Sequence, residues 1–144
     1  MRVLLDTSVL VAAMIESHPA HTESFTWLQK IKSNEHTGLI AAHSLAEIYA
    51  VLTALKVYPR ITPFIANRLL QENIVGVFEI IALSGADYIL IVNQMAELGI
   101  ISGAIYDALL MRAAQNADVD QVVTLNEKDF RRVYPALADR IAAP

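Results

Sequence analysis

The hydrophobic and polar positions of this chain follow two alternating patterns. Four short apolar runs, rich in aliphatic and β-branched residues, are typical of strands buried on both faces; they span residues 2–5, 38–42, 78–83 and 121–125. Longer segments between them repeat apolar residues at helical spacing and predict helices over 8–15, 22–31, 45–55, 63–74, 86–98 and 104–116. This alternation predicts an α/β fold in which helices cover both faces of a mostly parallel sheet of four or five strands.

Local turn signals divide the helical segments. The stretch YPRITP, residues 58–63, separates two helices into a hairpin, and Ser84 with Asp87 has the spacing of a capping box at the next helix start. The chain contains no repeat, no low-complexity tract and no visible linker. We therefore expect a single domain over residues 1–144.

Composition narrows the class of protein. A hydrophobic fraction of 55% with 18% charged residues is typical of a folded domain. Polar residues interrupt every apolar block before it reaches the length of a membrane span, and Asp6 interrupts an N-terminal stretch that otherwise resembles a signal peptide. We therefore expect a cytoplasmic protein that does not contact membranes. The net charge of -4 argues against nucleic-acid binding through a broad basic surface.

Several chemistries are excluded by what the chain lacks. Without cysteine, a metal ion would have to be held by oxygen or imidazole ligands. There is no G-x-S-x-G nucleophile elbow and no phosphate-binding glycine loop, which argues against serine hydrolases and nucleotide hydrolases. The remaining candidates for chemistry are acidic side chains in apolar surroundings.

Asp107 is the most unusual of these acids. It lies within GAIYDALLMRAA, residues 103–114, where its neighbours at helical spacing are apolar and the nearest cation, Arg112, points elsewhere. A buried carboxylate without a partner costs several kcal/mol or acquires a raised pKa. A simpler account is that Asp107 lies near the helix start, where the helix macrodipole favours an acid.

Three further acids could each have an ordinary local role. Asp6 follows a buried strand and could cap the next helix. Glu47 has the spacing of a capping box with Ser44 and lies four residues after His43, a possible partner. Asp129 is expected in a loop or a first helical turn. Taken singly, each of these residues could have a structural role only.

Taken together, the acids indicate a metal site. The carboxyl ends of parallel strands share one edge of the sheet, where ligands bind, and Asp6, Glu47 and Asp107 are all expected there. Without a cation they would repel one another, and Mg²⁺ or Mn²⁺ suits such oxygen ligands. Of the histidines only His43 is expected near this edge, and HPAH, residues 18–21, is not favoured as a metal site.

Four motifs, in their order and spacing, resemble PIN-domain ribonucleases and in particular the toxins of VapBC-type toxin–antitoxin pairs. They are LLDTSVLVA at the start, SLAEIYAVLT in the first third, GAIYDALLMRAA around residue 107 and VVTLNEKDFRRV near the end. The resemblance implies a PIN-like (Rossmann-like) three-layer sandwich. It also implies an endoribonuclease that uses Mg²⁺ or Mn²⁺ to activate water, a small antitoxin partner with a basic segment, and a homodimer.

The resemblance also assigns roles to residues. Asp6, Glu47 and Asp107 match three acids of the family's site, with Asp6 and Asp107 as direct metal ligands. Many relatives carry Asp where this chain has Asn126, so we assign Asp129 as the fourth acid and Asn126 as a neutral neighbour that orients water or substrate. Glu47 and Asp129 would bind a second ion, orient water or accept its proton, and the neutral Asn126 removes one carboxylate from a second metal position.

Two hydroxyl groups complete the implied pocket. Ser8 and Thr124 match small hydroxyl positions that border the site in such proteins and would help to position water. Two competing hypotheses remain. A phosphoacceptor receiver-like domain would also use Mg²⁺, although it needs an acid after the third strand, where this chain has IALSG. A non-catalytic protein-interaction module would use the acids only as caps and core features.

Overall fold

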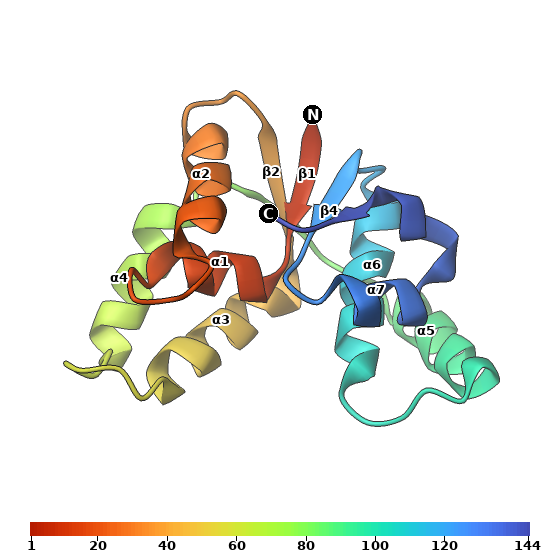
Figure 1. The fold of residues 1–144 in the computed structure, drawn as a ribbon. Coiled ribbons are helices and arrows are strands. Elements are labelled where there is room, and N and C mark those ends of the chain that lie inside the picture. The colour runs from red at the N-terminus through yellow and green to blue at the C-terminus, as the bar shows by residue number, and fades with distance from the viewer.

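A five-stranded parallel sheet forms the centre of the computed structural model, which describes residues 1–144 (Figure 1). Its strands lie in the order β3-β2-β1-β4-β5, and every neighbouring pair is parallel. They are β1 (Arg2–Leu5), β2 (Thr37–Ala41), β3 (Glu79–Ile81), β4 (Gln121–Val123) and β5 (Ile141–Ala142). The four predicted strands are therefore confirmed, and β5 is the fifth.

Helices cover both faces of this sheet. The helices α1 to α4 lie on one side and α5 to α7 on the other (Figure 1). Their bounds are α1 (Thr7–Met14), α2 (His21–Lys32), α3 (Ala42–Ala54), α4 (Pro63–Asn73), α5 (Gly85–Leu98), α6 (Ala104–Asn116) and α7 (Glu127–Val133), with a 3₁₀-helix, η1 (Pro135–Arg140). All six predicted helices are present. None of the helices combines the length and the apolar character needed to cross a membrane.

The strands alternate their side chains between two apolar cores. In β1, Val3 and Leu5 pack into the core under α1 to α4, whereas Leu4 packs into the core under α5 to α7. All three side chains are fully buried. Continuous apolar runs in a parallel sheet arise for this reason, since both faces of each strand are covered.

Gly38 of β2 is required by close packing. A β-carbon at this position would lie 2.5 Å from Ile31 Cγ2 of α2 and 2.8 Å from the Phe78 ring. We expect Gly38→Ala to lower the free energy of unfolding by about 1–3 kcal/mol, as overpacked cores do, in urea denaturation. Gly85→Ala is the matched control because no atom lies within 4 Å of its β-carbon position. Equal stability of the two variants would contradict this account of β2 packing.

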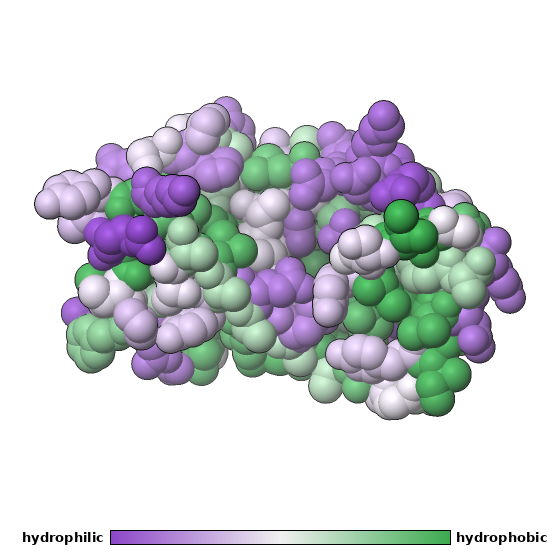
Figure 2. Space-filling model, turned by 90° about the horizontal axis from the view of Figure 1, so that it is seen from below, coloured by the Kyte–Doolittle hydropathy of each residue, from purple (hydrophilic) through white to green (hydrophobic).

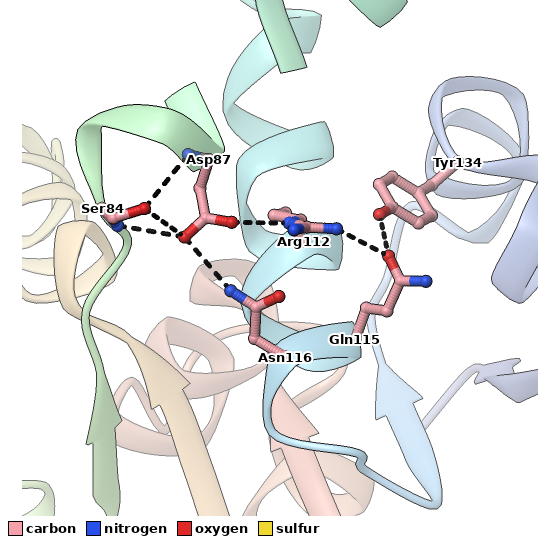
Figure 3. A network of polar contacts seen from close by, with 6 residues as sticks. All are labelled: Ser84, Asp87, Arg112, Gln115, Asn116 and Tyr134. Carbon is pink, nitrogen blue, oxygen red and sulfur yellow. Dashed lines mark hydrogen bonds and ion pairs between the residues drawn. The ribbon is translucent and has the colours of Figure 1, made fainter. Parts of the chain in front are cut away.

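A polar network joins the start of α5 to α6 (Figure 3). Ser84 and Asp87 form the predicted capping box, and the Asp87 carboxylate also accepts hydrogen bonds from Arg112 Nε at 2.8 Å and Asn116 Nδ2 at 3.2 Å. The Arg112 guanidinium, followed by the Ser84 amide, holds the pKa of Asp87 well below its usual range. Arg112 is thus committed to Asp87 and points away from Asp107, as predicted.

The strand order decides where a ligand can bind. The chain runs from β1 outward to β3 and then returns to place β4 on the other side of β1. A crevice therefore opens at the carboxyl ends of β1 and β4, the usual ligand position in open α/β sheets. A receiver-like domain has the strand order 2-1-3-4-5, so the receiver hypothesis is wrong for this chain.

Candidate active site

A pocket of about 360 Å³ opens beside the carboxyl ends of β1 and β4. Figure 2, which views the molecule from below Figure 1, shows hydrophilic side chains in the middle of this face and hydrophobic ones on both sides. The polar residues that line the pocket are Asp6, Thr7, Ser8, His18, Glu47, Asp107 and Asn126. Residues from separate parts of the chain therefore meet at the position that the strand order favours.

Asp6 accepts more side-chain hydrogen bonds than the other acids of the pocket. It directly follows β1, its backbone N–H donates to the Val123 carbonyl at 3.0 Å, and it is only 5% exposed. Its Oδ2 accepts hydrogen bonds from Ser8 Oγ at 2.6 Å and Thr124 Oγ1 at 2.9 Å. The predicted cap is wrong in one respect, because Asp6 occupies the N-cap position of α1 but its side chain makes no capping bond. These two hydroxyls hold it instead.

The two hydroxyls are themselves oriented by backbone groups. Ser8 Oγ accepts from the Leu125 N–H at 3.2 Å, and Thr124 Oγ1 accepts from the Asn126 N–H at 3.0 Å. Each hydroxyl proton is therefore directed at Asp6 Oδ2, while Oδ1 makes no hydrogen bond to the protein. An aspartate held in this way presents one free oxygen in a fixed direction.

Glu47 enters the pocket from α3. Because α3 starts at Ala42 and Ala41 is its N-cap, Ser44 does not cap the helix and the predicted capping box at Glu47 is wrong. Glu47 Oε2 accepts from Thr7 Oγ1 at 3.2 Å. Its other oxygen, Oε1, is buried and lies 3.3 Å from Nε2 of His43, the partner that the sequence suggested, although no hydrogen bond joins the two atoms. Glu47 thus meets Thr7 and His43 at the pocket wall.

Asp107 projects from the first turn of α6. Burial, followed by the charges of Asp6, Glu47 and Asp129, raises the pKa of Asp107 from 3.8 to about 7. Helix α6 starts where the sequence predicted. The helix macrodipole, which favours the ionised acid, does not offset the effects of burial and of the neighbouring negative charges on the pKa of Asp107. The fold therefore brings the acids close enough to repel one another, as the sequence predicted.

The structure separates Asn126 from Asp129. Asn126 lines the pocket, whereas Asp129 lies outside that lining in the first turn of α7. The Asp129 side chain is 57% exposed, and its Oδ1 lies 3.9 Å from Arg132. Asp129 still contributes to the raised pKa of Asp107, so it acts on the pocket through its charge.

Comparison with known proteins decides the family. A profile of the PIN domain matches residues 3–135. The chain belongs to the PIN domain family. It is 33% identical over 110 residues to ribonuclease VapC27 of Mycobacterium tuberculosis, which covers 76% of this chain and 74% of that protein. It is 34% identical over 112 residues to ribonuclease VapC40 of the same organism, covering 78% of each chain.

Solved structures show the same PIN fold. The VapBC2 complex of Rickettsia felis bound to a promoter DNA fragment contains a chain that matches with a TM-score of 0.69 and 22% identity, covering 100% of this chain and 99% of that one. FitAcB of Neisseria gonorrhoeae matches with a TM-score of 0.65 and 18% identity, covering 98% and 95%. The predicted PIN-like sandwich is therefore confirmed.

Two polar residues of this PIN domain's pocket, Thr7 and His18, were not predicted as site residues. The sequence hypothesis placed only His43 near the acids, but His18 also lines the pocket. The segment between α1 and α2 brings it there, and no periodic pattern in ESHPAH signals such a contact. His21, the other histidine of that segment, instead has its Nδ1 2.9 Å from the Ala12 carbonyl and stacks on Phe25.

The donor set of the pocket fits a hard divalent ion. No three acidic or histidine side chains converge closely enough to enclose an ion by themselves. Mg²⁺ is commonly bound by one or two carboxylates, with water and phosphate oxygens as its other ligands. The free Oδ1 of Asp6, the carboxylate of Glu47 and the destabilised carboxylate of Asp107 are oxygens of the required kind.

Proposed function

We propose that this chain is a Mg²⁺- or Mn²⁺-dependent endoribonuclease and the toxin of a type II toxin–antitoxin pair. The observation that carries the proposal is the meeting of Asp6, Glu47 and Asp107 in one pocket of a PIN domain. The curated relatives are named ribonucleases, and the solved neighbours include VapBC and FitAB assemblies. RNA phosphodiesters are the proposed substrate.

In this proposal Asp6 and Asp107 hold the ion, and Glu47 orients or deprotonates the attacking water. A bound divalent ion supplies activation of water near neutral pH and neutralises charge on the attacked phosphate. Ser8 and Thr124 keep Asp6 in place. Asn126 orients water or substrate from the pocket wall, and Asp129, outside the lining, adds negative charge that acts on Asp107.

The proposed partners follow from the surface. A small antitoxin with a basic segment would complement a chain of net charge -4 whose pocket is acidic. A second copy would cover apolar side chains on α5 and the loop after it, of which Ile89 is 66% exposed, Val92 53% and Ile101 82%. We therefore propose a homodimer that leaves the pocket open to RNA.

Removal of divalent ions tests the proposed function. We expect purified protein to cleave single-stranded RNA in Mg²⁺ or Mn²⁺, to lose this activity in excess EDTA, and to regain it when the ion is restored, because like charges in the pocket need a counter-ion. Gel electrophoresis of end-labelled RNA measures the cleavage under each of these conditions. Asp139→Asn, which removes an exposed acid of η1 outside the pocket, should cleave like the parent. Undiminished cleavage in EDTA would contradict the proposal.

A further inference from the structure

His18 is held rigidly at the pocket by the turn that carries it. Its backbone N–H donates to the Ile15 carbonyl at 3.0 Å, and its carbonyl accepts from the His21 N–H at 3.0 Å. Its ring is also fixed, because Nδ1 accepts a hydrogen bond from the Ala20 N–H at 3.0 Å. A side chain ordered through both backbone and ring costs little further entropy when it binds a ligand.

The Ala20 bond determines which ring nitrogen carries the proton. Because a backbone N–H can only donate, Nδ1 of neutral His18 must present its lone pair, and the proton lies on Nε2. His21 has the opposite arrangement, since its Nδ1 faces the Ala12 carbonyl and must donate. His18 therefore offers a hydrogen-bond donor at Nε2, and this nitrogen has no lone pair for a metal ion.

A hydrogen-bond donor beside the acids would help the pocket to bind an anionic substrate. Its acidic residues repel a polyanion, and Arg112 is committed to the Asp87 carboxylate. Arg132, whose charge opposes the rise in the pKa of Asp107, lies outside the pocket lining. His18 shares the pocket with Asp6, Glu47 and Asp107. The Nε2–H group can therefore meet an anionic oxygen of a substrate that approaches the acids.

We propose that His18 binds substrate, its Nε2–H group donating a hydrogen bond to a phosphate oxygen of the RNA chain in the pocket. This inference rests on the proposed function, because it takes the pocket as the site of RNA cleavage. His18 is assigned to the substrate and not to the metal ion. A hydrogen bond to a charged oxygen in a partly enclosed pocket is stronger than one between neutral groups.

Two substitutions of His18 separate its role as an Nε2 hydrogen-bond donor from its role in holding the turn through the Ala20 bond. In His18→Asn the side-chain oxygen can still accept from the Ala20 N–H, but the Nε2 donor is lost. In His18→Gln the amide nitrogen can reach the position of Nε2, so a donor is retained while the Ala20 bond is lost. We expect His18→Asn to raise KM for a single-stranded RNA about 10-fold with a much smaller change in kcat, and His18→Gln to recover most of the loss.

Two controls make the test specific. His21→Asn alters the neighbouring histidine, which does not line the pocket, and should leave KM at the parent value. Titration calorimetry with Mg²⁺ alone should give the same affinity for His18→Asn and the parent. An unchanged KM in His18→Asn would overturn the proposal that His18 binds RNA. A loss of Mg²⁺ affinity in this variant would overturn it as well, because His18 would then serve the metal ion. Parent-like cleavage by Asp107→Asn would instead overturn the proposed location of the active site.

Discussion

Replacing Asp107 by Asn is expected to stop RNA cleavage and, at the same time, to make the metal-free protein more stable. The variant keeps the size of the side chain but removes the charge that a divalent ion would bind. We expect kcat to fall about 100-fold or more, the scale on which removal of one preorganised charge-stabilising group lowers turnover. A variant that cleaves RNA at the parent rate would show that Asp107 is not a ligand.

The gain in stability depends on pH with a defined sign. The pKa of Asp107 is about 7 in the folded protein against 3.8 ordinarily, so its ionisation penalises the folded state. The penalty is absent below about pH 4, grows between pH 4 and 7, and is complete above pH 7. Its upper limit is about 4 kcal/mol, and because water and salt reach the pocket we expect about 1–2 kcal/mol.

Urea unfolding in EDTA measures this effect. Asp107→Asn should exceed the parent in free energy of unfolding at pH 8, and the difference should shrink toward pH 4, where Asp107 is largely neutral in the folded parent protein and its ionisation no longer opposes folding. The exposed Asp139→Asn variant controls for the loss of one negative charge. Added Mg²⁺ should stabilise the parent more than Asp107→Asn, since an ion stabilises the state that binds it. A gain that is the same at both pH values would exclude relief of repulsion as its cause.

The sheet was predictable because its strands are buried on both faces. An apolar run as short as Arg2–Leu5, followed by a segment of helical period, fits a covered parallel strand far better than a helix. By contrast, β5 has two residues and follows α7 and η1, so it carries no periodic pattern of its own. It forms because Thr124 N–H and its neighbours in β4 have an open edge to pair with.

The acids were predictable for a similar reason. Asp6 and Asp107 interrupt apolar segments, and such an interruption needs a physical cause. His18 gives no comparable signal in the sequence, since a histidine in a polar turn is ordinary. Only the path of the chain after α1 brings it to the pocket. The placement of Asn126 rather than Asp129 in the lining likewise depends on where α7 begins, which local sequence determines poorly.

Asp6→Asn and Asp6→Ala should both lose activity, by about 100-fold or more, but they should differ in stability. The amide oxygen of Asn can take the place of Oδ2 and accept from Ser8 and Thr124. Alanine leaves both hydroxyl protons without an acceptor, and Thr124 is fully buried. We therefore expect Asp6→Ala to lose about 1–3 kcal/mol relative to Asp6→Asn in urea unfolding. Equal stability would show that the hydroxyls find other partners.

The same pair of variants tests whether the acids act on one another. Asp6 is the charge that most raises the pKa of Asp107, after burial. Both substitutions should therefore lower the pKa of Asp107 below about 7 in metal-free protein, which NMR titration of the Asp107 carboxyl carbon measures. An unchanged pKa of Asp107 would mean that the charge of Asp6 does not act on the Asp107 carboxylate. A lowered pKa, together with the folded but inactive Asp6→Asn protein, would assign the loss of activity to the missing charge, since hydroxyl bonds and packing are retained in that variant.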